Sequence, residues 1–301
     1  MSGPWIPIGC GWLILLLSLN VHAVQSLGET EPRIEIGRGV SVQAPDCTQV
    51  KKLNPGATSG MYMIKPAGVK KPFKVYCEMR PDGGWTVFQR RTGGAVSFKR
   101  NWNEYKVGFG DLQRDHWLGL QKLWAITRVR GSCWVLRVEL CDFEGGSAFA
   151  EYKDFKLGGE RQAYRLTVGE YNGTAGDAIR GIDPVHGAFP GIDQNGYGFS
   201  TLDRDNDGCS PCIFGDIATN DCSREEGEGG WWYSRCGLAS LHGDWHPARD
   251  NKGWASGLHW LTWRGPATYS ARATGMMRKA GRRLIPDDPC TPRECRISAC
   301  R

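Results

Sequence analysis

The sequence predicts a loop-rich globular fold in which short strands and turns surround an aromatic core. The 301 residues include 41 Gly, which is about twice ordinary usage. They also include 13 Trp, 10 Phe and 9 Tyr, and the apolar runs are short and broken by Gly, Asn and Asp. Glycine frees the backbone for turns, and aromatic side chains bury large areas. This composition excludes a long-helix bundle, a coiled coil, a collagen and a disordered chain.

Strands are predicted where apolar and polar residues alternate with a period of two. These segments are residues 73–79, 85–90 and 134–140. The glycine-rich segment 81–84 between the first two is typical of a hairpin turn. Cys133 and Cys141 flank the third strand at the same parity, so both are expected on one face of it.

Helical spacing of apolar residues occurs in residues 111–124, where we expect a helix. Regular signals nearly vanish from residue 181 to residue 265, a stretch of Gly, Asp and Trp. That texture is typical of functional loops.

The first 23 residues are typical of a secretory signal peptide. An apolar run spans residues 12–19, and Val21 and Ala23 are small residues placed as at a cleavage site. The run is shorter than the roughly 20 residues that a membrane span needs, and no later segment is apolar enough to span. We therefore expect a secreted, extracellular protein whose mature chain begins with a short linker over residues 24–44.

Cysteine usage agrees with secretion. Of the 12 Cys, Cys10 lies in the signal segment, and the others are expected to be mostly disulfide partners in an oxidising compartment. Their odd number leaves one thiol free or paired with another chain. Asn172 begins an Asn-Gly-Thr acceptor for N-glycosylation, which predicts a surface loop in a secreted glycoprotein.

Charge and motifs exclude several function classes. The net charge is +6 with a pI of about 8.7, and the basic residues are scattered, which argues against nucleic-acid binding. The sequence contains no nucleophile elbow, zinc-protease motif, P-loop or dinucleotide fingerprint. His242 and His246 are four residues apart, but Gly243 and Pro247 argue against a helix that would bring them together. We expect a protein without catalytic activity.

An acidic loop carries the sharpest local chemistry. Asp203, Asp205 and Asp207 alternate just before Gly208, and three carboxylates at this spacing repel unless a cation neutralises them. Hard oxygen ligands of this kind suit Ca²⁺. An EF-hand is excluded because its twelfth position would be Phe214 rather than Glu. The remaining alternatives are a different Ca²⁺ loop and a solvated acidic turn.

A long series of motifs runs in order from about residue 45 to residue 280. They include Asp46-Cys47, Ser59-Gly60-Met61-Tyr62, Pro72-Phe73-Lys74-Val75-Tyr76-Cys77, Gly83-Gly84-Trp85-Thr86-Val87-Phe88, Tyr171-Asn172-Gly173-Thr174-Ala175-Gly176-Asp177, Gly198-Phe199-Ser200-Thr201-Leu202-Asp203 and Gly230-Trp231-Trp232-Tyr233-Ser234-Arg235-Cys236. The series resembles the fibrinogen C-terminal (fibrinogen-related) domain family. Cys236-Gly237 and residues 269–277 resemble in particular its angiopoietin-like and fibrinogen-like secreted members.

The resemblance implies an α+β fold with a central antiparallel sheet, short helices and a loop-rich C-terminal Ca²⁺-binding subdomain. The domain would cover residues 45–280, followed by a Cys-containing tail over 281–301. It also implies two disulfides, which are Cys47–Cys77 and Cys222–Cys236. Each closes a loop and would contribute roughly 2–4 kcal/mol of stability.

The family's Ca²⁺ site implies two carboxylates, from Asp205 and Asp207, and two backbone carbonyls, from Cys209 and Pro211. This chain carries extra residues over 209–220, which places the carbonyl ligands in doubt more than the carboxylates. Cys209 and Cys212 are expected either to pair locally or to pair with Cys133, Cys141 or the tail. The spacing leaves open the partners of Cys133, Cys141, Cys209, Cys212, Cys290, Cys295 and Cys300.

The resemblance also implies a ligand pocket beside the Ca²⁺ loop. In the family, a cis peptide at Arg235–Cys236 directs backbone N–H groups, including that of Gly237, toward a ligand oxygen such as an acetyl carbonyl. Pocket walls would come from Trp245, Trp254 and Ala255.

Comparison with individual family members gives evidence both for and against an acetylated-glycan ligand. Acetyl-binding lectin members carry His where this chain has Gly237, and Tyr in the loop over residues 225–230, which has no aromatic residue here. The pair Trp254-Ala255 does match them. Fibrin's pocket for peptide knobs needs Asp where this chain has Ala255, so binding of that kind is not expected.

Two functions follow from this resemblance. The first is a lectin-like innate-immune role that recognises acetylated or anionic glycans. The alternative is a secreted receptor ligand of the angiopoietin-like kind, a signalling factor. Gly237 argues against the first, and the absence of a long coiled coil from this sequence argues against the second. Any homo-oligomer would form through the domain surface or the odd cysteine.

Overall fold

The computed structural model describes residues 43–129, 133–183, 187–188, 191–214, 216–248, 255–264 and 269–281. The predicted signal peptide, nearly all of the linker and the cysteine-containing tail therefore lie outside the described residues. In the part that is described, no helix has the length and apolar character needed to cross a membrane.

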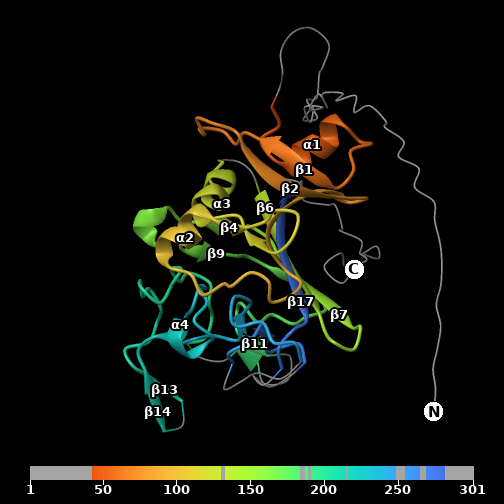
Figure 1. Cartoon of the computed structure of the whole chain (residues 1–301). Coiled ribbons are helices and arrows are strands. Elements are labelled where there is room, and N and C mark those ends of the chain that lie inside the picture. The colour runs from red at the N-terminus through yellow and green to blue at the C-terminus, as the bar shows by residue number, and fades with distance from the viewer. Residues whose placement is uncertain are drawn as a thin grey trace, which may run out of the picture. The chain divides into compact units, whose positions relative to one another are not determined.

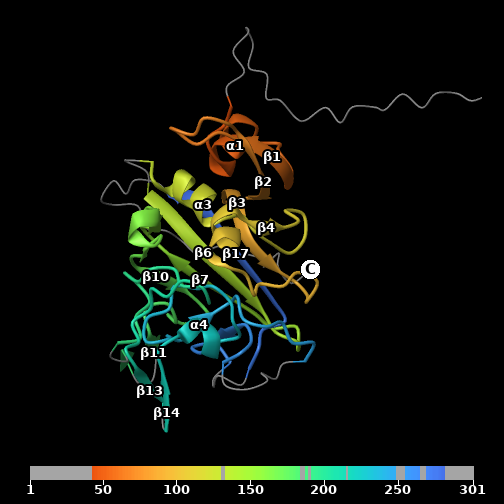
Figure 2. The ribbon, with the colours of Figure 1, turned by 60° about the vertical axis from the view of Figure 1, so that its left-hand side comes forward.

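A large antiparallel sheet organises the domain, with the strand order β1-β2-β3-β17-β6-β7-β10 (Figures 1 and 2). The strands are β1 (Gly60–Ile64), β2 (Phe73–Arg80), β3 (Gly83–Arg91), β6 (Cys133–Cys141), β7 (Ser147–Tyr152), β10 (Tyr171–Gly173) and β17 (Ala273–Gly281). The last strand in the chain, blue in Figure 1, lies in the middle of the sheet and pairs with β3 and β6. The sheet is therefore complete only when the C-terminal end of the domain has joined it.

Few and short helices accompany the sheet, which confirms the predicted α+β class. They are α1 (Cys47–Leu53), α2 (Trp102–Val107), α3 (Leu120–Thr127), the 3-10 turn η1 (Glu160–Gln162) and α4 (Cys222–Glu225). Sequence signals at their N-termini explain where two of them begin. Asp46 caps α1 by accepting the N–H of Gln49, and Asn101 with Glu104 forms a capping box on α2.

The remaining strands are all short. They are β4 (Phe109–Gly110), β5 (His116–Trp117), β8 (Lys156–Leu157), β9 (Leu166–Thr167), β11 (Ile182–Asp183), β12 (Gly187–Ala188), β13 (Cys212–Phe214), β14 (Ile217–Thr219), β15 (Ala239–Ser240) and β16 (His259–Trp260). Between residues 181 and 265 the described backbone contains only such short strands and α4. This agrees with the predicted loop-rich C-terminal region.

The predicted helix over residues 111–124 is wrong in its first half. His116 and Trp117 form β5, which pairs with β3 and β4, and the helix begins only at Leu120. Gly119, at φ 107°, separates the two elements in a conformation that other residues rarely adopt. Trp117 contributed to the helix-like spacing of apolar residues, but it is a buried residue of a strand rather than of a helix.

Aromatic packing attaches the loop-rich region to α2 and the sheet. The ring of His242 lies 4.9 Å from both the Trp117 and the Trp231 ring centres. The Tyr105 hydroxyl accepts the N–H of Gly230 at 3.0 Å and donates to the Phe98 carbonyl at 2.8 Å. Burial lowers the pKa of His242 to about 3, so this imidazole is a neutral core group.

Candidate functional site

The three carboxylates of the acidic loop make two different kinds of contact. Asp203 accepts the backbone N–H of Trp102 at 2.9 Å and the Thr201 hydroxyl at 2.7 Å. It therefore ties the loop to the start of α2. Asp205 instead accepts the backbone N–H of Asp207 at 2.9 Å, within the loop itself.

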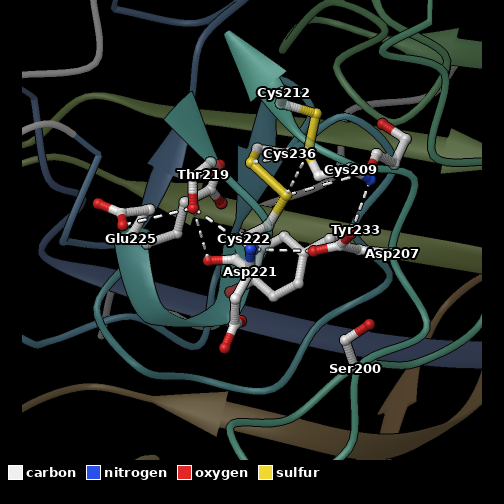
Figure 3. Close-up of a disulfide and its surroundings, with 12 residues drawn as sticks. Ser200, Asp207, Cys209, Cys212, Thr219, Asp221, Cys222, Glu225, Tyr233 and Cys236 are labelled. Carbon is white, nitrogen blue, oxygen red and sulfur yellow. Dashed lines mark hydrogen bonds between the residues drawn. A yellow bond between two sulfur atoms is a disulfide. The ribbon is translucent and has the colours of Figure 1, made fainter. Parts of the chain in front are cut away.

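Asp207 organises the backbone that follows it (Figure 3). One carboxylate oxygen accepts the N–H of Cys209 at 2.7 Å, and the other accepts the N–H of Cys222 at 2.8 Å. Burial raises the pKa of Asp207 to about 6, and the charges of Asp205 and Asp221 add to this effect. This carboxylate is thus partly withdrawn from water and lies among negative neighbours.

These features fit the predicted cation. The charges with the largest effect on Asp207 are the carboxylates of Asp205 and Asp221, so a positive ion would relieve their repulsion. Each oxygen of Asp207 accepts one N–H and keeps a second lone pair for a metal. The Asp205 and Asp207 carboxylates with the carbonyls of Cys209 and Pro211 remain the predicted Ca²⁺ ligands, and hard oxygen donors suit that ion.

The inserted segment forms its own small unit beside this loop. Cys209 and Cys212 are joined by a local disulfide, which decides between the pairings that the spacing left open. The β13–β14 hairpin follows, and Ile213 near its start is 60% exposed. The insertion therefore adds an exposed hairpin next to the acidic loop.

Other cysteines agree with the expected pattern. The structure contains Cys47–Cys77 and Cys222–Cys236, the two disulfides that the resemblance implied. Cys141 is also disulfide-bonded, whereas Cys133, at the other end of β6, is a free thiol.

Asn172 is exposed on β10, as a glycosylation acceptor requires. Its glycosylation stays a prediction.

The backbone at the second disulfide differs from the expected one. Among the described residues, the only cis peptide bond is Ser210–Pro211, so the cis bond predicted at Arg235–Cys236 is wrong. The chain turns there through two consecutive positive φ angles, 63° at Cys236 and 101° at Gly237. Glycine suits the second position because it has no Cβ.

A buried amide that the sequence did not single out fills the space beside Gly237. A Cβ added at Gly237 would lie 2.6 Å from Cδ of Gln194. Gln194 is fully buried, and its side-chain nitrogen donates to the carbonyls of Cys236 at 3.1 Å and Ala239 at 2.8 Å. Its side-chain oxygen accepts the indole N–H of Trp231 at 3.4 Å. The only sequence signal of this packing was the glycine at position 237.

Comparison with known proteins identifies this architecture. The sequence profile of the family described as fibrinogen beta and gamma chains, C-terminal globular domain, matches residues 43–280. The chain belongs to this family. Human angiopoietin-4 is 39% identical over 263 residues, which cover 87% of this chain and 47% of that protein. Fibrinogen-like protein 1 from Bos taurus is 38% identical over 251 residues, covering 82% of this chain and 76% of that protein.

Solved structures agree with the sequence relatives. The fibrinogen-like globe domain of human ANGPTL2 has a TM-score of 0.67 at 35% identity, covering 78% of this chain and 98% of that chain. Lamprey fibrin D-dimer, solved with the peptide Gly-His-Arg-Pro-amide, has a TM-score of 0.71 at 32% identity, covering 86% and 81%. This fibrinogen-related chain spans about half the length of angiopoietin-4 and about three quarters of fibrinogen-like protein 1.

The contacts and burial of the other predicted pocket residues can be described one by one in this fibrinogen-related domain. Trp245 donates its indole N–H to the Arg272 carbonyl at 2.9 Å, and its ring lies against Gly94. Ala255 is fully buried at a φ of 51°. Arg235 is exposed, and Trp254 lies outside the described residues. The structure thus brings Gln194 to the Cys236–Gly237 turn, and the role of Trp245 as a pocket wall stays a prediction.

The loop-rich region also contains a buried acid and a buried histidine that the sequence did not single out. Glu226 follows α4 and is fully buried, with one carboxyl oxygen 3.5 Å from Nε2 of His259 on β16. Its carboxyl oxygens accept no hydrogen bond from the described residues. Burial raises the pKa of Glu226 well above its usual value and lowers the pKa of His259 to about 4. Burial thus favours the neutral form of both groups.

Proposed function

We propose that this chain is a secreted, non-catalytic fibrinogen-related protein that acts as a ligand for a cell-surface receptor. The observation that carries this proposal is the packing of Gln194 against Gly237. In the lectin members that the sequence resembles, a histidine at this position serves acetyl recognition. This chain has Gly237 at that position, and the buried amide of Gln194 fills the space that a side chain would occupy. This packing favours the receptor-ligand alternative over the glycan-binding hypothesis.

The relatives also support a receptor-ligand function. They are angiopoietins and fibrinogen-like proteins, and the globe domains of ANGPTL2 and ANGPTL6 are structural neighbours. Secretion is supported by the predicted signal segment and by disulfides between Cys47 and Cys77 and between Cys222 and Cys236. Because the chain matches only part of angiopoietin-4, receptor binding is proposed for this domain itself.

Binding of the labelled chain to intact cells tests the proposal. A receptor ligand should bind a subset of cell lines, lose binding when surface proteins are removed with trypsin, and keep it after enzymatic removal of glycans. In parallel, the chain is applied to an array of acetylated sugars with and without EDTA. EDTA-sensitive binding to the array, combined with loss of cell binding after glycan removal, would overturn the receptor proposal in favour of the lectin hypothesis.

Ca²⁺ is proposed as the structural ion of the acidic loop. Adding Ca²⁺ is expected to raise the free energy of unfolding by about 2.7 kcal/mol at a concentration of 100 times Kd, because the ion binds only the folded loop. Chemical denaturation with Ca²⁺ and with EDTA measures this difference. The variant Asp205→Asn/Asp207→Asn should lose it.

Asp216→Asn is the matched control, because it removes an exposed carboxylate from the inserted hairpin outside the proposed ligand set. It should keep the full Ca²⁺ effect. An unchanged Ca²⁺ effect in Asp205→Asn/Asp207→Asn would refute the site.

A further inference from the structure

Two disulfides of the loop-rich region lie in direct sulfur contact (Figure 3). Sγ of Cys209 is 3.4 Å from Sγ of Cys222 and 3.9 Å from Sγ of Cys236. Cys209 is bonded to Cys212, and Cys222 is bonded to Cys236. All four cysteines are buried, so the second disulfide has a neighbouring sulfur held against it rather than solvent.

The Asp207 carboxylate holds the two cysteines of the closest contact together. It accepts the backbone N–H of Cys209 with one oxygen and that of Cys222 with the other. Cys222 is also the first residue of α4, whose N-cap is Asp221. The 3.4 Å contact thus joins two backbone positions that are fixed by the same side chain, which keeps the sulfurs adjacent when one bond is opened.

The local disulfide is the one that an external thiol can reach first. Cys209 and Cys212 enclose only Ser210 and Pro211, both of which are exposed, and the exposed residue Ile213 follows. Cys236 lies beneath the Gln194 contact. Ser210 and Pro211 bring this turn to the surface, and Cys209 is 8% exposed, whereas Cys222 and Cys236 are fully buried.

We propose that these four cysteines form an internal thiol–disulfide exchange relay. An external dithiol reduces the Cys209–Cys212 bond and is itself oxidised to a disulfide. The freed Cys209 side chain rotates until its thiolate lies in line with the Cys222–Cys236 bond, and it then attacks Sγ of Cys222. A Cys209–Cys222 bond forms and the Cys222–Cys236 bond breaks. The electron pair leaves on Sγ of Cys236, which takes up a proton from solvent. Cys212 and Cys236 end as free thiols.

The exchange would change the region next to Gln194. Cys236 and Gly237 form the turn with positive φ angles, and the disulfide to Cys222 is its covalent link to α4. After exchange, α4 is tied to the inserted segment through Cys209, and the turn is released. The relay is thus a redox device that couples the exposed insertion to the turn at Cys236, whatever partner the domain binds.

Two single variants make a matched test. Cys212→Ser and Cys209→Ser each remove the local disulfide and leave one thiol, but only Cys209 contacts the second disulfide. Each purified protein is alkylated with iodoacetamide without reduction, digested, and analysed by mass spectrometry. In Cys212→Ser we expect label on Cys236 and a Cys209–Cys222 cross-linked peptide. In Cys209→Ser we expect label on Cys212 and an intact Cys222–Cys236 peptide.

Cys133 is a free thiol in both variants and serves as an internal standard for labelling. Label on Cys209 alone, with Cys222–Cys236 intact in Cys212→Ser, would overturn the relay. If Cys212→Ser does not fold, the native chain is treated with limiting dithiothreitol and sampled over time. The relay then requires label on Cys212 and Cys236 while Cys47–Cys77 is still intact. Early label on Cys209 and Cys212 together would contradict it.

Discussion

Replacing Gly237 with alanine is expected to lower the free energy of unfolding by roughly 2–6 kcal/mol. Two effects act together at this position. The residue has a φ of 101°, which strains any residue with a Cβ, and the new methyl group would lie 2.6 Å from Cδ of Gln194. Gln194 cannot move aside without breaking its bonds to the carbonyls of Cys236 and Ala239. Chemical denaturation of the two proteins measures the loss.

Gly196→Ala is the matched control for this prediction. Gly196 has a φ of 91°, but a Cβ added there meets nothing within 4 Å. It should therefore show only the backbone strain, on the order of 1–3 kcal/mol. In the double variant Gly237→Ala/Gln194→Ala, the combined loss should be smaller than the two single losses added together, because the clash is gone. Equal losses for Gly196→Ala and Gly237→Ala would show that Gln194 does not occupy this space.

Replacing Glu226 with glutamine is expected to stabilise the domain at neutral pH. Burial raises the pKa of Glu226 in the folded state, so the folded protein keeps a proton that the unfolded chain loses above about pH 4.3. This difference makes the native protein less stable as pH rises, by up to about 1.4 kcal/mol per pH unit. Glutamine carries no such proton. The stability gap between the variant and the native protein should therefore widen from about pH 4.3 upward.

His259 acts with the opposite sign. Its pKa is lowered to about 4 in the folded state, so stability is present above its unfolded pKa of about 6.5 and is lost as pH falls below that value. Between about pH 4.3 and about pH 6.5, Glu226 and His259 change the stability of the native protein in opposite directions as pH varies. Glu226→Gln should consequently uncover a steeper loss of stability on acidification. Urea denaturation across a pH series measures both slopes.

The exposed neighbour Glu225 supplies the control, since Glu225→Gln should leave the pH profile nearly unchanged. A charged ion pair between Glu226 and His259 would give the reverse result. In that case Glu226→Gln would destabilise the domain at neutral pH, because it would leave a buried imidazolium without its partner.

Much of the sheet followed from local patterns. Alternation over residues 73–79, 85–90 and 134–140 located β2, β3 and β6, because each of these strands has side chains with different surroundings on its two faces. The same kind of reasoning failed at Trp117. Its spacing suited a helix, but pairing with β3 made it a strand residue, and local periodicity does not report on pairing partners far away in the chain.

For the candidate site as well, some features could be predicted from the sequence and others required the tertiary structure. The family, the acidic loop and the two family disulfides could be predicted from the sequence, because they depend on residue types in a fixed order. The spacing alone presented Asp203, Asp205 and Asp207 as equivalent acids, and the family resemblance selected Asp205 and Asp207 as Ca²⁺ ligands. Only the tertiary structure assigned Asp203 to α2 and Asp207 to the backbone of Cys209 and Cys222.

Tertiary structure alone also decided the contacts across the loop-rich region. Gln194 meets Gly237 and Glu226 meets His259 across long stretches of mostly irregular backbone. Cys209 meets Cys222 across the inserted β13–β14 hairpin. Residue order predicts a contact only where a regular helix or strand converts spacing into direction. The loops between residues 181 and 265 have no such period, so their contacts depend on how the whole region packs against the aromatic core.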